Sequence, residues 1–550
     1  MTGAHVPRRS GKRALARGVF ALTLAAACSE RRNDANAPTF TRDVAPIVQR
    51  HCAVCHRPGQ AGPFPLLSFE DVARRAKQVA RVTRERIMPP WPPRRDVGGP
   101  FEGERVLSDE ELVTLQRWVE SGAPEGDPDD LPEAPRWPEG WQLGPPDLVL
   151  ELEPAFVVPA EGKDVYRNFV LPIPGTETRH VRTLEFLPGN PKLLHHAVMR
   201  VDTTGSAREL DARDPGPGFG GMSMGMAALP DGRFLGWAPG KSPDPGDEDT
   251  AWRLEPGMEL VLQMHLRPSG REESIRPSIG LHFASSAPTK HPRALTLAST
   301  RIDIPPGAAD YTIEDAFVLP VPVDVLSVYP HAHYLGKDLR AFAQLPDGAT
   351  RWLLRIDPWD FDWQDQYRFA EPVSLPAGSR LVMRYTYDNS AENPANPSSP
   401  PRRVLYGESS TDEMGELLLE VLPASPADRA LLERDLARHL ELGKLDYFGQ
   451  LLARDPSDPR AQLSVGNSLV RLGRHAEAIP HYRELVRLRP RDVRAHLALA
   501  DTLFQQGDVD GALEEYRAAS ALAPEQPEVQ RKLEQALERA QLRSPDTGQR

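Results

Sequence analysis

Four strand-like segments decide how this chain folds: LLHHAVMRV (193–201), LVLQMHLRP (260–268), YPHAHYLGKDL (329–339) and TDEMGELLLEV (411–421). Together they carry five imidazoles and one thioether, which are His195, His196, His265, His331, His333 and Met414. Imidazole suits copper, zinc, iron and nickel, while a thioether selects for soft Cu(I). The series predicts two sites of three ligands each. Three protein ligands with an open position are typical of a site for chemistry.

The spacing of these histidines limits which of them can share a metal. Residues i and i+2 of a strand lie on one face, so His331 and His333 can reach one ion from one side of a sheet. His195 and His196 are adjacent and would point to opposite faces of a regular strand. They can share a metal only at a strand end or at a bulge. The alternative is that strand histidines simply pack in the core or lie on the surface.

The four segments resemble those of the copper type II, ascorbate-dependent monooxygenases, the family of peptidylglycine alpha-hydroxylating monooxygenase and dopamine beta-monooxygenase. The likeness spans residues 149–424, and it includes GWAPG at Gly236–Gly240 and the stretch HAHYLGK. The resemblance implies two antiparallel jelly-roll sandwiches, at 149–290 and 291–424.

The same resemblance implies a role for each candidate ligand. One copper, the electron-transfer ion, would be held by His195, His196 and His265. The second copper, where oxygen is activated, would be held by the catalytic set His331, His333 and Met414.

The chain departs from the peptide-hydroxylating members of that family in three places. Those enzymes hold a substrate-binding arginine two residues before the H-x-H pair, where this chain has Tyr329. They carry a substrate-binding tyrosine four residues after the copper methionine, where this chain has Leu418. The family's disulfides cannot form, because no cysteine falls within 149–424. These departures argue against a peptide ending in glycine as the substrate.

Length and composition limit the number of domains, the class of partner and the type of fold. A chain of 550 residues is too long for one hydrophobic core and indicates several domains. A net charge of −12 argues against a nucleic-acid partner. The 57 prolines favour many turns and a loop-rich β architecture over one long helical array.

Residues 1–28 are typical of an export signal. Several basic residues precede the apolar run GVFALTLAAA, which ends at Cys28 and is too short to span a bilayer. LAAAC resembles a bacterial lipobox, which implies that Cys28 bears a lipid. Its leucine lies one place upstream of the usual position, so a plain signal peptide stays open. We expect an exported protein of the bacterial periplasm or cell envelope, with membrane contact only through that lipid.

The segment HCAVCHRPG (51–59) contains the attachment signature of c-type haem. Cys52, Cys55 and His56 form C-x-x-C-H, in which two thioether bonds hold one haem and the histidine is the proximal iron ligand. A short-loop disulfide is one alternative in an exported protein. A zinc half-site is another, but the chain has no second cysteine pair.

The sequence around this signature resembles a small all-α cytochrome c domain over residues 38–127. FTRDVAPIVQRHC resembles its first helix. LSDEELVTLQRWVESGAPEGDP resembles its closing helix, which a capping box of Ser108 and Glu111 would begin. RERIMPPWPP supplies Met88 as a candidate distal haem ligand. The adjacent Pro-Pro could equally mark a structural turn.

Three other stretches of the sequence are less specific in the structure or function that they predict. Residues 128–148 are rich in Pro, Glu, Asp and Gly and are typical of a linker. GGMSMGM (220–226) alternates methionines that could bind Cu(I) or serve as flexible packing. RWLLRIDPWDFDWQDQYRF (351–369) is rich in aromatic residues, which could fill a core or line a cleft between the copper domains.

A 34-residue period marks the C-terminal part of the chain. Residues that recur at this spacing are Pro456, Pro490 and Pro524, and Gly473 and Gly507. The pattern resembles the tetratricopeptide repeat. It predicts an α-helical solenoid over 425–542, with clear repeats at 457–490 and 491–524, a degenerate repeat at 425–456 and a capping helix at 525–542. Such a solenoid offers a concave surface for a protein partner.

Taken together, these segments predict an exported copper monooxygenase. It would hydroxylate a C–H bond of a small-molecule or peptide substrate with O2, using electrons from a donor passed through its own c-type haem. Its cofactors would be one covalent haem c and two copper ions. The alternative is an envelope protein that transfers electrons or binds copper without oxygenation, and that docks partners through its repeats.

Overall fold

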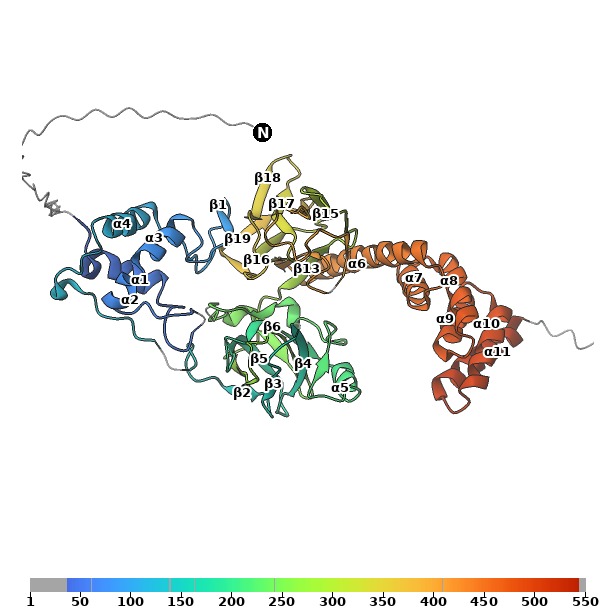
Figure 1. The fold of residues 1–550 in the computed structure, drawn as a ribbon. Helices are drawn as coiled ribbons and strands as arrows, with labels where there is room; N and C mark the ends of the chain where they lie inside the picture. Colours follow the sequence, from blue (N-terminus) through green and yellow to red (C-terminus); the bar gives the residue numbers. More distant parts are fainter. Residues whose placement is uncertain are drawn as a thin grey trace, which may run out of the picture.

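The computed structural model describes residues 37–60, 62–137, 140–162, 164–241, 243–407 and 409–543. The predicted export segment, with Cys28, lies outside the described residues. In the described part, a short helical region leads into a sheet-rich centre, and a row of helices follows (Figure 1). The multidomain architecture expected from the chain length is confirmed.

The N-terminal helical region packs short helices around one small core. Its helices are η1 (Phe40–Val44), α1 (Ala45–His51), α2 (Phe69–Ala73), α3 (Ala76–Arg84) and α4 (Asp109–Glu120). The capping box predicted for α4 is present. Ser108 Oγ accepts from the Glu111 N–H at 3.1 Å, and Glu111 Oε2 accepts from the Ser108 N–H at 2.8 Å. These bonds satisfy two backbone donors and fix where the helix begins.

Strand β1 (Pro93–Gly98) corrects the prediction that this region is all-α. It pairs antiparallel with β18 (Thr350–Ile356) of the sheet-rich centre. Just beyond it, Phe101 is buried in the core of that centre, with its ring centroid 5.0 Å from that of Phe369. The strand reads PRRDVG and lacks apolar alternation, so its partner strand rather than its own sequence makes it extended.

The first half of the sheet-rich centre consists of antiparallel strands. They are β2 (Leu148–Glu151), β3 (Phe156–Val158), β4 (Val165–Pro172), β5 (Arg179–Leu187), β6 (Leu194–Asp202), β7 (Phe219–Gly220), β8 (Leu235–Trp237), β9 (Trp252–Leu254), β10 (Glu259–Leu266), β11 (Glu273–Ile275) and β12 (Ser278–Phe283). One sheet has the order β7-β4-β10-β6-β8 and another β2-β12-β5-β9. Both sheets bury side chains in one core, with Met199 and Leu262 from the first and Phe186 and Leu281 from the second.

The second half repeats this plan. Besides β18, its strands are β13 (Arg293–Ala298), β14 (Asp303–Ile304), β15 (Tyr311–Val318), β16 (Val323–Ala332), β17 (Gly336–Gln344), β19 (Tyr367–Leu375), β20 (Arg380–Tyr387), β21 (Val404–Leu405) and β22 (Gly415–Pro423). The sheets β13-β22-β16-β19 and β1-β18-β17-β20-β15 share a core that includes Val325 and Met383. The jelly-roll order of connections stays a prediction.

The C-terminal helices follow the 34-residue period. They are α6 (Pro426–Arg454), α7 (Pro459–Arg471), α8 (His475–Leu488), α9 (Val493–Gln505), α10 (Val509–Leu522) and α11 (Pro527–Arg543). The Tyr482 hydroxyl donates to Asn467 Oδ1 at 2.8 Å, and the Tyr516 hydroxyl donates to Asp501 Oδ1 at 2.6 Å. The same bond thus ties the two helices of each repeat. None of the helices within the described ranges combines the length and apolarity needed to cross a membrane.

Helix α6 differs from the degenerate repeat predicted at 425–456, because it is one continuous helix of 29 residues. It runs from the second half of the sheet-rich centre to the other C-terminal helices (Figure 1). Leu432 and Leu436 lie in the core of that second half, while Leu445 and Phe448 pack in the core of the repeats. A single helix packs first in the β core and then in the core of the repeats. It therefore continues without a turn between them.

The dual packing of α6 predicts where the repeats can be removed. A variant ending at Ala424 loses Leu432 and Leu436 from the β core, each contributing about 1.5–3 kcal/mol of burial. It should therefore unfold at a lower temperature than a variant ending at Asp455, which keeps both. Calorimetric unfolding compares the two variants directly, and equal transition temperatures would show that α6 does not stabilise the β core.

Candidate metal centre

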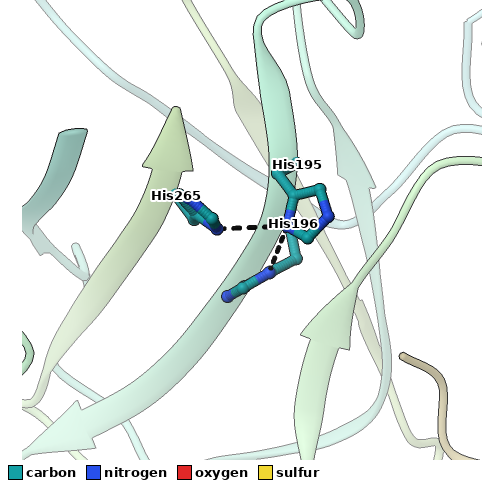
Figure 2. Close-up of side chains that lie close together, drawn as sticks. All are labelled: His195, His196 and His265. Atoms are coloured by element: carbon teal, nitrogen blue, oxygen red, sulfur yellow. Dashed lines mark hydrogen bonds between the residues drawn. The ribbon is translucent and has the colours of Figure 1, made fainter. Parts of the chain in front are cut away.

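Three histidines converge between neighbouring strands of the first half. His195 and His196 come from β6, and His265 comes from β10 (Figure 2). The Nδ1 atom of His195 lies 3.1 Å from Nδ1 of His196 and 3.0 Å from Nδ1 of His265. One ring nitrogen from each histidine lies within 4.8 Å of the others. The sequence analysis grouped these same three residues.

A bulge allows the adjacent pair to share one face. In the pairing of β10 with β6, His265 lies opposite His196, but the next residue, Leu266, lies opposite Leu194. His195 is the extra residue between these two pairs. The spacing required such a bulge if both side chains were to face one point, and the structure provides it.

The outer nitrogens of two of these rings are held by carboxylates. The Nε2 of His265 donates to Asp164 Oδ2 at 2.7 Å, and the Nε2 of His195 donates to Asp362 Oδ1 at 3.2 Å. The Arg267 guanidinium donates to the same Asp362 oxygen at 2.7 Å. Hydrogen bonding from His195 and Arg267 keeps the pKa of Asp362 well below its usual range. Ionised carboxylates hold the protons on Nε2 and leave the Nδ1 lone pairs turned inward.

Burial favours the neutral form of two of these imidazoles, those of His265 and His196. It lowers the pKa of His265 to about 4, an effect that the neighbouring His195 increases and the Asp164 carboxylate opposes. Burial and the neighbouring histidines also lower the pKa of His196 well below its usual value. Neutral imidazole is the form that binds metals. The convergence of three imidazole nitrogens, two of them on rings whose outer edges are hydrogen-bonded to carboxylates, fits an ion such as copper or zinc.

His331 and His333 form a second pair at the end of β16, with ring centroids 5.2 Å apart. The Nδ1 of His331 donates to Gln364 Oε1 at 2.6 Å, and the Nδ1 of His333 donates to the Asp412 carbonyl oxygen at 3.1 Å. These bonds leave the two Nε2 atoms for a ligand. In the three-histidine cluster the two ring nitrogens have the opposite roles, since Nε2 of His195 and His265 is hydrogen-bonded and Nδ1 faces the other rings.

Met414 directly precedes β22, the strand that pairs with β16. Strand β16 pairs with β22, and its last registered pair is Ala332 opposite Gly415. Continuing this register by one residue brings His333 alongside Met414, which is buried. The register brings the two backbones together, and the role of the Met414 thioether as a third ligand of this pair stays a prediction.

Glu413 is a residue that the sequence analysis missed. Its fully buried carboxylate accepts from the backbone N–H groups of His333 at 2.9 Å, Leu335 at 2.7 Å and Met414 at 3.1 Å. Burial raises its pKa to about 8 although these bonds oppose the rise. The side chain fixes the turn after the H-A-H pair against the strand that carries Met414. The sequence analysis singled out the next residue, Met414, but no local sequence pattern indicated a role for Glu413.

Phe361 lies between the two histidine groups. Its ring centroid is 5.6 Å from that of His195 and 5.8 Å from that of His333. It belongs to the aromatic segment for which core packing and a cleft lining were both open. Trp359 and Tyr367 are buried in the β core, and Phe361 is buried as well, which favours core packing for these three residues.

Cys52, Cys55 and His56 lie in the turn after α1. The backbone N–H groups of Cys55 and His56 both donate to the Cys52 carbonyl oxygen, at 3.1 and 2.9 Å. Both thiols are free, so the disulfide alternative is not formed here. The Nδ1 of His56 donates to the Phe64 carbonyl oxygen at 3.0 Å. A ligating histidine commonly donates its other nitrogen in this way, which fits an iron ligand at Nε2.

The methionines outside β22 fit metal binding less well. Met88 follows α3 and is 38% exposed, and its role as distal haem ligand stays a prediction. Met224 is buried against Phe219 and Val261, whereas Met226 is 71% exposed. The two thioethers thus have opposite environments, which favours packing over a shared Cu(I) site.

Comparison with known proteins identifies the C-terminal helices. A profile of the tetratricopeptide repeat family matches residues 445–490 and 465–527. The prediction of such repeats from the 34-residue period is confirmed. No similar sequence was found among curated proteins.

Solved structures similar to a part of this chain were also found. One is the first repeat domain of Spaghetti (RPAP3) bound to the HSP90 peptide SRMEEVD, at 18% identity and a TM-score of 0.18, covering 18% of this chain and 80% of that one. A mutant of MamA is similar at 20% identity and a TM-score of 0.18, covering 20% of this chain and 68% of that one. MamA from MSR-1 is similar at 18% identity and a TM-score of 0.18, covering 20% of this chain and 67% of that one.

The carboxylate behind His265 predicts a change in metal affinity. Asp164→Asn removes the charge that holds the Nε2 proton and should weaken copper binding by about 10–100-fold. Glu272→Gln, at an exposed position, is the matched control and should bind copper like the wild type. Competition with a chromophoric Cu(I) chelator measures both affinities. An unchanged affinity in Asp164→Asn would exclude this carboxylate as a support for the ligand.

Proposed function

We propose that this protein is an exported monooxygenase containing copper and haem, which hydroxylates a C–H bond with O2 and receives electrons through its own c-type haem. The observation that carries this proposal is the three-histidine cluster, with inward Nδ1 atoms and two outer nitrogens held by carboxylates. The resemblance of residues 149–424 to the copper type II monooxygenases assigns the electron-transfer ion to this cluster. It assigns the oxygen-activating ion to His331, His333 and Met414.

The bound groups would supply the redox chemistry, namely one-electron transfer at haem and copper and activation of O2 at the copper beside Met414. The chain's own residues orient and enclose these sites. Asp164 and Asp362 keep protons on the outer nitrogens of His265 and His195. Gln364 holds the proton on Nδ1 of His331. Each of these three imidazoles is thus preset in one tautomer, with its other nitrogen left to bind a metal.

The surroundings of Tyr329 bear on the substrate. This residue stands where peptide-hydroxylating relatives carry an arginine, and its ring stacks on Phe234 with centroids 4.2 Å apart. Phe234 belongs to the first half of the sheet-rich centre and Tyr329 to the second. An aromatic contact between the halves occupies the position and offers no cation for a terminal carboxylate. This supports a substrate other than a peptide ending in glycine.

The tetratricopeptide repeats support a second candidate function. They match a repeat family, and such solenoids commonly present a concave surface to a protein partner. In this alternative the protein transfers electrons or stores copper in the cell envelope, docks a partner through the repeats and does not oxygenate anything. Metal analysis together with oxygen uptake separates the two. Stoichiometric copper with reductant-driven oxygen uptake favours the monooxygenase, and haem without tightly bound copper favours the alternative.

The two candidate copper sites should respond differently to substitution. His265→Ala removes a nitrogen ligand and should lower the copper content per chain. Met414→His replaces soft sulfur with nitrogen, so copper should be retained while most oxygen uptake is lost. Mass spectrometry of metals and an oxygen electrode give the two readouts. The ligand assignment fails if both variants match the wild type in copper content and oxygen uptake.

The haem assignment predicts covalent attachment through two thiols. The double variant Cys52→Ala, Cys55→Ala should lose the haem that remains with the wild type after acid-acetone extraction. Met88→Ala should keep that haem but shift its midpoint potential downward, because methionine ligation raises the potential. Spectroscopy of protein made in cells competent for haem attachment measures both. A wild type without haem under those conditions would contradict the assignment.

A further inference from the structure

A short loop between β18 and β19 contacts both histidine sites and approaches the C-x-x-C-H turn across Gly240. Asp362 accepts from His195 of the three-histidine cluster at 3.2 Å. Gln364 accepts from His331 of the second pair at 2.6 Å. Between these two residues lies Trp363, whose indole approaches Gly240 as Cys55 does.

Gly240 defines how close Trp363 comes to that turn. The point where a β-carbon on Gly240 would lie is 3.0 Å from Cys55 Sγ and 3.4 Å from Cη2 of Trp363. The sulfur and the six-membered ring of the indole therefore flank the same glycine. Gly240 has φ +83°, a conformation that favours glycine, and a β-carbon there would crowd both groups.

Arg105 holds this junction together. Its Nη1 donates to the Gly240 carbonyl oxygen at 2.7 Å, and its guanidinium carbon lies 4.9 Å from the centroid of the Trp363 ring. Asp365 lies 3.7 Å from Arg105 Nη2 and 3.5 Å from Lys241 Nζ. The junction thus joins the N-terminal helical region to both halves of the sheet-rich centre.

The polar atom of the indole is not explained by packing. Trp363 Nε1 is buried without a hydrogen-bond partner, among the residues that the structure describes. A tryptophan used only to fill space there leaves a donor unsatisfied, at a cost that phenylalanine or leucine would avoid. The conjugated ring, rather than its N–H group, is what this position uses.

We propose that Trp363 is the electron-transfer bridge between the C-x-x-C-H turn and the two histidine sites, with Asp362 leading to His195 and Gln364 leading to His331. The proposal rests on the proposed function, because it requires haem on Cys52 and Cys55 and copper on the histidines. Trp363 passes one electron from ferrous haem, which becomes ferric, to a cupric ion, which becomes cuprous. No proton moves, and an external one-electron donor returns the haem to the ferrous state.

The Arg105 cation determines whether the Trp363 indole is itself oxidised during electron transfer. A positive charge over the ring disfavours a second positive charge on the indole. Trp363 therefore bridges the two sites without itself being oxidised, and no tryptophan radical accumulates.

The test compares Trp363→Leu and Trp363→Phe with Trp352→Leu in the full-length protein loaded with haem and copper. Trp352 lies on β18, 37% exposed, with its ring 5.2 Å from that of Phe342, and its ring contact among the described residues involves none of the three candidate sites. Under anaerobic conditions a photoexcited flavin reduces the haem, and its reoxidation by cupric ions is followed in the visible haem bands. Haem and copper content and the haem midpoint potential are measured in each variant.

We expect Trp363→Leu to slow the first-order reoxidation by about tenfold, equivalent to about 1.4 kcal/mol of barrier. Its metal content and midpoint potential should match the wild type. Trp363→Phe lacks the outer ring that approaches Gly240 and should be slowed less, while Trp352→Leu should be unchanged. A wild-type rate in Trp363→Leu overturns the proposal.

The phenylalanine variant keeps the test decisive if the leucine variant does not retain haem or copper. In that case a wild-type rate in Trp363→Phe overturns the proposal, and a slowed rate supports it. The proposed function fails in a different way, since wild-type protein without copper or without haem shows no reoxidation phase before any variant is made.

Discussion

The hydrogen bonds from two imidazoles to two carboxylates are the interaction on which the candidate centre depends. Without Asp164 and Asp362, the rings of His265 and His195 could turn or change tautomer, and the inward nitrogens would no longer converge. Three lone pairs facing one another at about hydrogen-bond distance repel unless a cation or a shared proton lies between them. The outer carboxylates therefore hold a geometry that a metal ion would stabilise.

Because of Asp362, the three-histidine cluster depends on both halves of the sheet-rich centre. It belongs to the second half of the sheet-rich centre, whereas the three histidines belong to the first. The cluster is thus completed only when the halves lie together, and the Phe234–Tyr329 stack and the Phe361 ring occupy the same boundary. The helical region joins the second half through β1, and Arg105 connects it to Gly240 of the first half and Trp363 of the second. Three regions of the chain meet where the candidate chemistry lies.

The C-terminal repeats are built on a different principle. Their helices contact their neighbours in sequence, so the 34-residue period reappears as the same Tyr–Asn or Tyr–Asp bond in each repeat. Helix α6 joins this local architecture to the β core by packing against each in turn. A partner bound by the repeats would therefore be held at the far end of a rigid helix from the histidine sites.

The sequence by itself determined the features that depend on local pattern. The repeat period and the α4 capping box were readable from spacing, because each depends on a local periodicity. The grouping of His195, His196 and His265 came from the resemblance to the copper monooxygenases, since spacing alone directs adjacent strand residues to opposite faces. Tertiary structure alone decided the rest. The polar strand β1, the supporting residues Asp362, Gln364 and Glu413, and the approach of Trp363 to Cys55 carry no local signal. Each gains its role from a partner distant in sequence, since the free energy of a hydrogen bond or a strand pair depends on what folding brings within reach.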